Sequence, residues 1–220
     1  TIADASLREA KAIDSPDLYS STLRLVRHKK FNLKGLITDY NALGSEMCLA
    51  EAAGSDLSEY RHRRESALQD IFSSILVSYG AKDDYRSLVE FLSDGNADRM
   101  LAAQVVSAMT LSLIVLFDGP KLESLIELYN HYDSVCDEKM AARTLAGIIF
   151  ALYSSPRRVT DNQALVKLLE LWQDSIMTYR RLRETVRVII GTRDTERVAA
   201  KMREEVMPEL MKMRPDIIKT

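Results

Sequence analysis

The chain has 220 residues, of which 46% are hydrophobic and 28% are charged, and this composition is typical of a globular protein with a real core. Its 30 lysine and arginine residues nearly balance 32 aspartate and glutamate residues, for a formal net charge of −2. This balance argues against a dedicated nucleic-acid-binding domain, although it leaves room for a local basic groove. The few glycines and prolines fall between periodic segments and no alternating strand pattern occurs, so we predict an all-α protein.

The N-terminal third, residues 1–80, is expected to form three helices that do not clearly repeat. The first covers about residues 15–27, the second is capped by Asn32 and ends at Gly54, and the third closes at Gly80. Short links favour packing of neighbouring helices side by side. We therefore expect a divergent repeat or an N-terminal cap of a larger helical stack, with a separate helical hairpin domain as the alternative.

A short apolar pattern then returns three times. It reads YRSLVEFL at residues 85–92, LESLIELY at 122–129 and LVKLLELW at 165–172, so successive copies start 37 and 43 residues apart. Periods of roughly 34 to 47 residues are typical of solenoids built from paired helices. Each copy also holds a glutamate in the same slot, namely Glu90, Glu127 and Glu170. We interpret these carboxylates as a solvated outer face rather than as a ladder of ligands.

A second helix follows each of the first two copies. Residues 100–117 align with 140–153 through the pairs that begin at Ala102 and Ala141. Small residues at these positions would let neighbouring helices approach closely. The third unit continues into a more polar helix around residues 180–190, as expected for a capping repeat.

On this spacing and these alanine pairs, residues 83–190 resemble α-solenoid repeats of the HEAT/armadillo type, with tetratricopeptide-like units as the close alternative. The resemblance implies a right-handed α-α superhelix of antiparallel helix pairs. It also implies a scaffold or interaction domain, because most such families act in that way.

We expect one continuous domain with three parts: N-terminal helices at 1–80, helical repeats at 81–193, and a C-terminal helix at 194–220 that packs on the last repeat. Because the chain starts at Thr1 without methionine, we also expect it to be a piece of a longer protein, in whose remainder an export signal could lie.

The C-terminal helix is predicted to start at Asp194 or Thr195 and to run to about Met213. Pro208 should kink or divide it. Its methionine-rich surface fits packing on the last repeat, and docking onto a partner or a later part of the chain is the alternative.

No set of residues indicates catalysis, a metal or a cofactor. His28, His62 and His131 have no partners at metal-binding spacing, and there is no glycine-rich phosphate loop. Cys48 and Cys136 lie far apart and are interpreted as reduced packing residues. We therefore predict a protein that is not an enzyme. The cysteines favour the cytoplasm, while the location stays open.

Three basic clusters form a candidate binding patch, in which each cluster alone is more often a solvated or salt-bridged face. Its residues are Arg61, Arg63, Arg64, Arg157, Arg158, Arg180, Arg181 and Arg183. In a solenoid they could line one groove and bind a phosphate backbone or an acidic partner.

We predict a helical-repeat scaffold whose second helices line a face that binds a protein or peptide. A structural spacer within a larger repeat protein is the alternative, and a nucleic-acid binder or an enzyme of the DNA-glycosylase type is less favoured. The uncharged run at 101–117 is at the low edge of membrane-spanning length and aligns with 141–152, so we expect a buried repeat helix and no membrane span.

Overall fold

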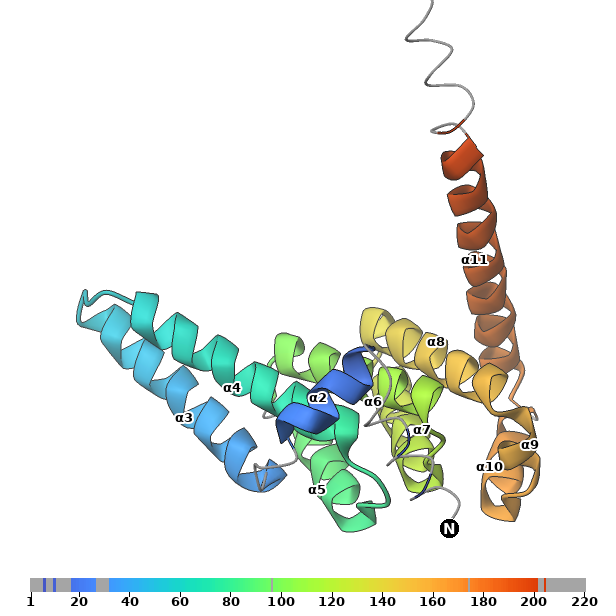
Figure 1. Ribbon diagram of the computed structural model, residues 1–220, viewed down its shortest axis with the longest axis horizontal. Helices are drawn as coiled ribbons and strands as arrows, with labels where there is room; N and C mark the ends of the chain where they lie inside the picture. The colour runs from blue at the N-terminus through green and yellow to red at the C-terminus, as the bar shows by residue number, and fades with distance from the viewer. Residues whose placement is uncertain are drawn as a thin grey trace, which may run out of the picture. The chain divides into compact units, whose positions relative to one another are not determined.

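The computed structural model describes residues 17–26, 32–95, 97–173 and 175–201, together with Ser6, Ala10 and Glu204. Every regular element in these residues is a helix, which confirms the all-α prediction for this part of the chain (Figure 1). The helices are α2 Leu18–Val26, α3 Leu33–Ala52, α4 Ser58–Val77, α5 Lys82–Ser93, α6 Arg99–Val115, α7 Gly119–Ser134, α8 Glu138–Ser154, α9 Pro156–Thr160, α10 Gln163–Gln173 and α11 Ile176–Lys201. The chain forms two compact units, residues 1–170 and 171–220.

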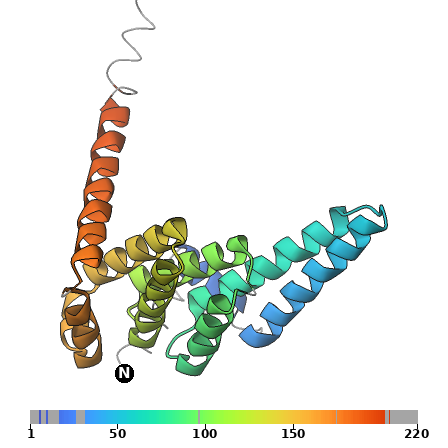
Figure 2. The same cartoon turned by 180° about the vertical axis from the view of Figure 1, so that it is seen from behind.

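The first unit is built from two layers of helices, which Figures 1 and 2 show from opposite sides. In one layer α3 packs against α5 and α5 against α7, and in the other α4 packs against α6 and α6 against α8. The α3–α4, α6–α7 and α7–α8 contacts join the layers, and α2 lies against α4. The chain therefore alternates between the layers. The first helices of successive pairs, α3, α5 and α7, contact one another, and so do the second helices, α4, α6 and α8.

The repeated sequence pattern coincides with repeated burial. Its first two copies lie in α5 and α7, and both bury the same four slots. The buried pairs are Tyr85 and Leu122, Leu88 and Leu125, Val89 and Ile126, and Leu92 and Tyr129. The third copy lies in α10, whose Leu165 is fully buried. The glutamates Glu90, Glu127 and Glu170 are exposed, as predicted.

The second helices repeat even more closely. With a shift of 39 residues, seven buried positions of α6 fall on buried positions of α8. The pairs are Leu101 and Met140, Ala102 and Ala141, Val105 and Thr144, Val106 and Leu145, Ala108 and Gly147, Met109 and Ile148, and Ser112 and Ala151. The uncharged run in α6 is thus largely enclosed by neighbouring helices, as the alignment predicted. Among the described helices, none combines the length and apolar character needed to cross a bilayer.

Several helix ends form as predicted. The side chain of Asn32 accepts a hydrogen bond from the Gly35 N–H at 3.3 Å and caps α3. The turns after α3 and α4 contain Gly54 and Gly80 at φ of +69° and +67°, a region that glycine enters without a steric penalty. A further cap lies at the start of α10, where the Asn162 side chain accepts a hydrogen bond from the Leu165 N–H at 3.3 Å.

The residue before α5 is Ala81, and Asp83 and Asp84 lie inside the first turn, where the positive end of the helix dipole favours carboxylates. One predicted helix start is wrong. The helix predicted to begin at Asp194 or Thr195 is a continuation of α11. No proline interrupts α11, so the helix has no strong reason to end before Lys201.

The predicted boundaries between the three parts of the chain can be compared with the observed helices and compact units. The boundary at 80/81 separates α4 from α5, and that at 193/194 lies within α11, whereas the two compact units divide at 170/171. Residues 205–220, and with them Pro208 and the predicted helix end at Met213, lie outside the described residues.

Candidate functional site

The second-helix layer exposes the same two apolar positions on two neighbouring helices. On α6, Leu111 is 39% and Ile114 is 41% exposed, and on α8, Phe150 is 39% and Tyr153 is 82% exposed. The shift of 39 residues that superposes the buried positions also places Leu111 on Phe150 and Ile114 on Tyr153. Residues three apart share one face of a helix. The four side chains, called the second-helix face below, therefore repeat as a pattern rather than occurring as scattered exposed residues.

This face is supported by close packing between α6 and α8. A side chain at Gly147 would overlap Thr110 Oγ1, so glycine is the residue that permits the two helices to lie this close. Arg143 of α8 donates from Nη1 to the Ala103 carbonyl at 3.2 Å and to Ser107 Oγ at 2.9 Å on α6. These contacts fix the spacing of the exposed apolar pairs.

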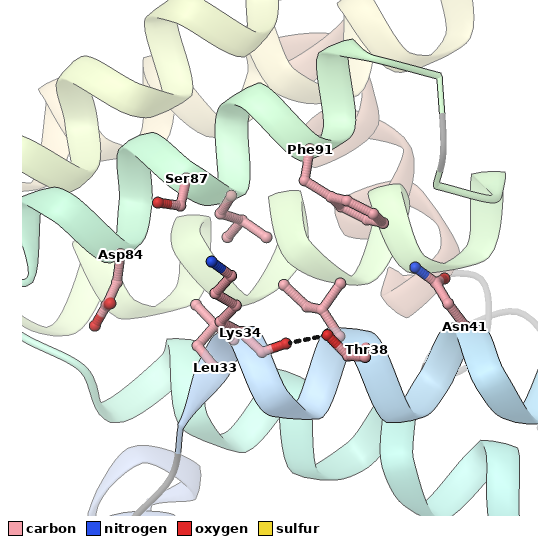
Figure 3. A pocket seen from close by; sticks show the side chains of 9 residues that line it. Leu33, Lys34, Thr38, Asn41, Asp84, Ser87 and Phe91 are labelled. Atoms are coloured by element: carbon pink, nitrogen blue, oxygen red, sulfur yellow. Dashed lines mark hydrogen bonds between the residues drawn. The ribbon is translucent and has the colours of Figure 1, made fainter.

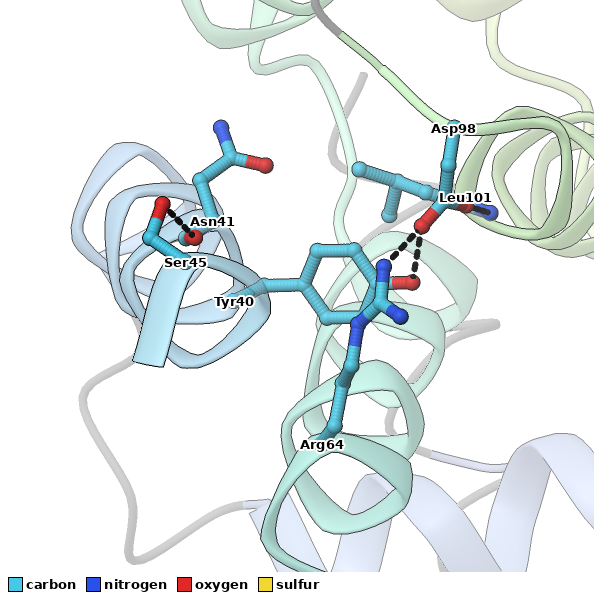
Figure 4. A network of polar contacts seen from close by, with 6 residues as sticks. All are labelled: Tyr40, Asn41, Ser45, Arg64, Asp98 and Leu101. Atoms are coloured by element: carbon cyan, nitrogen blue, oxygen red, sulfur yellow. Dashed lines mark hydrogen bonds and ion pairs between the residues drawn. The ribbon is translucent and has the colours of Figure 1, made fainter. Parts of the chain in front are cut away.

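At the start of α6, one carboxylate ties three helices together (Figure 4). Asp98 Oδ1 accepts from the Leu101 N–H at 2.8 Å and caps α6, while Oδ2 accepts from the Tyr40 hydroxyl at 2.8 Å and from Arg64 Nη2. The guanidinium of Arg64 also lies 4.6 Å from the centroid of the Tyr40 ring, which allows a cation–π contact. Burial and the hydrogen bond to Asp98 raise the pKa of Tyr40 to about 12.

The same arrangement of a capping carboxylate and an arginine recurs at the start of α8, where the arginine is more exposed. Asp137 Oδ1 accepts from the Met140 N–H at 3.2 Å, and Oδ2 accepts from Arg99 Nη2 at 2.8 Å. The hydrogen bond from Arg99 holds the pKa of the Asp137 carboxyl below its usual range. In both cases the arginine comes from the preceding helix of the layer, Arg64 on α4 or Arg99 on α6.

A fully buried lysine occupies the junction of α4, α6 and α7. Lys121 Nζ donates to the carbonyls of Ile75 and Ser78 at 3.1 and 2.7 Å and to Ser112 Oγ at 2.6 Å. Its side chain is 0% exposed. The two carbonyls belong to the end of α4, where a positive charge is favourable because carbonyl dipoles point outward.

The buried carboxylate of Asp118 lies one helical turn before Lys121. Its Oδ2 accepts from the Gly80 N–H at 2.9 Å and from the Tyr85 hydroxyl at 3.0 Å. Burial, followed by the negative charge of Asp118, raises the pKa of Tyr85 well above its ordinary value. Buried charges can mark catalytic sites. Here the lysine and the carboxylate bind main-chain groups, and these hydrogen bonds hold the end of α4 against the start of α7.

The predicted basic residues do not gather into one groove within the first unit. Arg61, Arg63 and Arg64 lie on the first half of α4, whereas Arg157 and Arg158 lie on α9 at the opposite end of residues 1–170 (Figures 1 and 2). Arg64 binds Asp98, and Arg63 Nη1 lies 3.7 Å from Glu46 Oε2. The remaining three lie on α11 in the second unit, where Arg180 and Arg183 are exposed and Arg181 is half-buried.

The structure describes both cysteines and two of the three histidines. Cys48 and Cys136 are free thiols as expected, but both are exposed, so the packing role predicted for them is wrong. His62 is exposed, and His131 is half-buried with its ring 5.4 Å from the Tyr132 ring. His28 lies outside the described residues. No group of three metal-ligating side chains occurs in the part of the chain that the structure describes.

Sequence reasoning found the alanine pairs but missed the buried polar groups. Lys121 looks like a surface residue in the sequence, and the signal that could have found it is its place two residues from the start of a helix whose other early positions are apolar. Asp98 could have been found as a cap, but its contacts with Tyr40 and Arg64 join residues 58 and 34 positions apart.

A comparison with protein-family models, curated proteins and solved structures gives no match to this chain.

Proposed function

We propose that this chain is a non-enzymatic helical-repeat scaffold whose second-helix face binds a protein or peptide. The observation that carries the proposal is that Leu111 and Ile114 on α6, and Phe150 and Tyr153 on α8, are exposed at equal repeat positions. Exposed apolar surface that recurs on adjacent helices is characteristic of an interaction site, whereas single exposed apolar residues are normal on any surface.

The architecture supports this reading. Alternation of α3 to α8 between two layers fits a right-handed superhelix of antiparallel pairs of the HEAT/armadillo type, with tetratricopeptide-like stacking as the alternative. Such a stack presents a continuous surface made of one helix from each repeat. Two of the four exposed residues are aromatic, and aromatic side chains are enriched where interfaces are fully buried. The partner we expect is an apolar segment that lies across α6 and α8.

The test is a pull-down from native cell lysate with the immobilised chain and two matched variants. The double variant Phe150→Glu and Tyr153→Glu places charge on the second-helix face, and we expect it to lose a captured partner about tenfold or more, since it removes two central contacts. The control is Leu49→Glu, a change of the same kind at a 72% exposed position on α3. Equal capture by both variants, or no specific capture by the unaltered chain, would contradict the proposal.

A structural spacer within a larger repeat protein is the second candidate. One observation favours it: Ala142 of α8 is exposed at the position where Ala103 of α6 receives Arg143. A helix of a neighbouring repeat could use that open site in the same manner. A partner captured by a longer version of the protein, and never by this chain, would favour the spacer.

A further inference from the structure

A second surface with binding character lies in the other layer, where α3 and α5 form the walls of a groove (Figure 3). Two adjoining hollows make up this groove, and they share Asn41 and Phe91. The first has a volume of about 210 Å³ and is lined by Leu33, Lys34, Ile37, Thr38, Asn41, Asp84, Ser87, Leu88 and Phe91. The second has a volume of about 510 Å³ and is lined by Asn41, Gly44, Ser45, Met47, Cys48, Arg64 and Phe91.

The groove has an apolar floor. Leu33 and Ile37 of α3 are each 8% exposed, and Leu88 of α5 is 1% exposed. Phe91 of α5 is half-buried and lines both hollows. An apolar side chain that enters the first hollow would therefore contact these apolar side chains at its floor, which is favourable by the hydrophobic effect.

The rims of the groove are polar along their length. On α3 the rim consists of residues at steps of four, three and four, which form one line along a helix: Lys34, Thr38, Asn41 and Ser45. This line covers eleven residue steps, or about 16 Å at about 1.5 Å per residue. The opposite rim on α5 carries Asp84 and Ser87. An extended chain of about five residues at about 3.3 Å each would cover the same length.

Three rim side chains are unused within the described part of the chain. The ammonium of Lys34, the carboxylate of Asp84 and the amide of Asn41 have no hydrogen-bond or ion-pair partner there, although polar contacts are frequent elsewhere in this unit. They offer a positive charge, a negative charge, and an amide that both donates and accepts. These are the complements of a peptide's charged side chains and main chain.

We propose that the α3–α5 groove binds an extended peptide segment with one apolar anchor residue. The anchor enters the first hollow against Ile37, Leu88 and Phe91, the peptide main chain bonds to Asn41, and charged side chains of the peptide pair with Lys34 and Asp84. A simple acyl chain matches this groove poorly, because its polar groups are distributed along both rims rather than placed at one end. The site shares no residue with the second-helix face, so either proposal can fail alone.

The first experiment selects heptapeptides from a random library against the whole chain and then measures their affinity for two tryptophan variants. Ser87→Trp fills the groove from an exposed position, and we expect it to weaken the selected peptides about tenfold or more. Glu90→Trp introduces the same side chain at an exposed position of α5 outside the groove, and affinity should stay within about twofold. Failure to select any peptide, or equal affinity for Ser87→Trp and the unaltered chain, would overturn the proposal.

The second experiment uses the two exposed cysteines as reporters that require no mutation. Cys48 lines the second hollow, and Cys136 lies in the turn between α7 and α8. A selected peptide should slow alkylation of Cys48 by iodoacetamide and leave that of Cys136 unchanged, as followed by mass spectrometry. Equal rates with and without peptide would overturn the proposal. So would protection of Cys48 by myristate alone, or by raised protein concentration alone, which indicate an acyl ligand or a second copy of the chain.

Discussion

Within the layer formed by α4, α6 and α8, two helix–helix junctions can be compared. The α4–α6 junction and the α6–α8 junction are made by different kinds of side chain. At the first, buried Lys121 binds the end of α4 together with Ser112 of α6, and Asp98 binds Arg64 of α4. At the second, Gly147 of α8 lies against Thr110 of α6. The first junction therefore contains a buried polar cluster around Lys121, whereas the second combines close packing at Gly147 with exposed polar contacts of Arg143 and Arg99.

The difference shows that neighbouring helices of one layer can be joined by different kinds of side-chain contact. A polar junction must satisfy every buried donor and acceptor, so it fails sharply when one partner is removed. A junction of small residues has no such requirement and fails when volume is added. The two junctions should therefore respond to opposite kinds of mutation.

Lys121→Met should give the largest effect. The change keeps the length of the side chain but removes the donor for the carbonyls of Ile75 and Ser78 and for Ser112 Oγ. Leaving buried acceptors unsatisfied after loss of a charged partner typically costs about 3 kcal/mol or more. We expect a fall of about 3 kcal/mol in the free energy of unfolding, measured by urea denaturation.

The control for this variant is Lys139→Met, at an exposed position on α8. A surface substitution of this kind should change the free energy of unfolding by less than about 0.5 kcal/mol. Similar losses of unfolding free energy in the two lysine variants would show that the buried contacts of Lys121 do not stabilise the fold.

Asp98→Ala should give the next largest effect. It removes the cap of α6 and the acceptor of Tyr40 and Arg64, which together should cost about 2 kcal/mol. Because Asp98 stabilises the neutral phenol, the pKa of Tyr40 should fall from about 12 toward its ordinary value of 10.0. Urea denaturation and the ultraviolet absorbance of tyrosinate between pH 9 and 13 measure the two effects.

The sign of the pH dependence follows from the raised pKa of Tyr40. Its contribution to stability is complete below about pH 10 and is lost as the pH rises through about 12, since the unfolded chain ionises first. Asp137→Ala serves as the comparison, because this cap is the repeat equivalent of Asp98 and its arginine partner, Arg99, lies nearer solvent than Arg64. It should destabilise less, and it should leave the titration of Tyr40 unchanged. The reverse order of stability would refute the assignment of Asp98 as the central contact of its junction.

These two junctions also explain which parts of the fold were predictable. Apolar positions at 3.6-residue spacing, the alanine pairs and Asn32 are local signals, and they predicted the helices and the α6–α8 alignment. The polar junction depends on contacts such as Lys121 to Ile75, 46 positions apart, for which the sequence has no local signal. The α4–α6 pair therefore shows no visible repeat although its place in the layer is the same.

The candidate binding sites also differ in how far the sequence could predict them. Leu111 and Phe150 are related by the alignment of two helices, so the prediction that second helices form an exposed face could be made from the sequence. The α3–α5 groove depends on how far two helices separate around Phe91, which follows from packing of the whole layer and has no motif. The arginine clusters had a clear compositional signal, but residues 61–64 and 157–158 are placed at opposite ends of the first unit (Figure 1).

Gly147→Ala should give the smallest effect and the most direct test of the close-packed junction. A methyl group at this position overlaps Thr110 Oγ1, so Thr110 must rotate and lose its 2.8 Å hydrogen bond to the Val106 carbonyl. Overpacking costs about 2 kcal/mol, and the higher helix propensity of alanine offsets about 1 kcal/mol of it. We expect a net loss of about 1 kcal/mol in urea denaturation.

Thr110→Ala supplies the control, because it removes the atom that a methyl group at Gly147 would meet. In that background the same Gly147→Ala change should become stabilising by about 1 kcal/mol, since only the gain in helix propensity remains. A reversal of sign shows that the spacing of α6 and α8 is set by this one contact. If the change destabilises equally in both backgrounds, contacts along the rest of the two helices set their close approach, and Thr110 is not the residue that limits it.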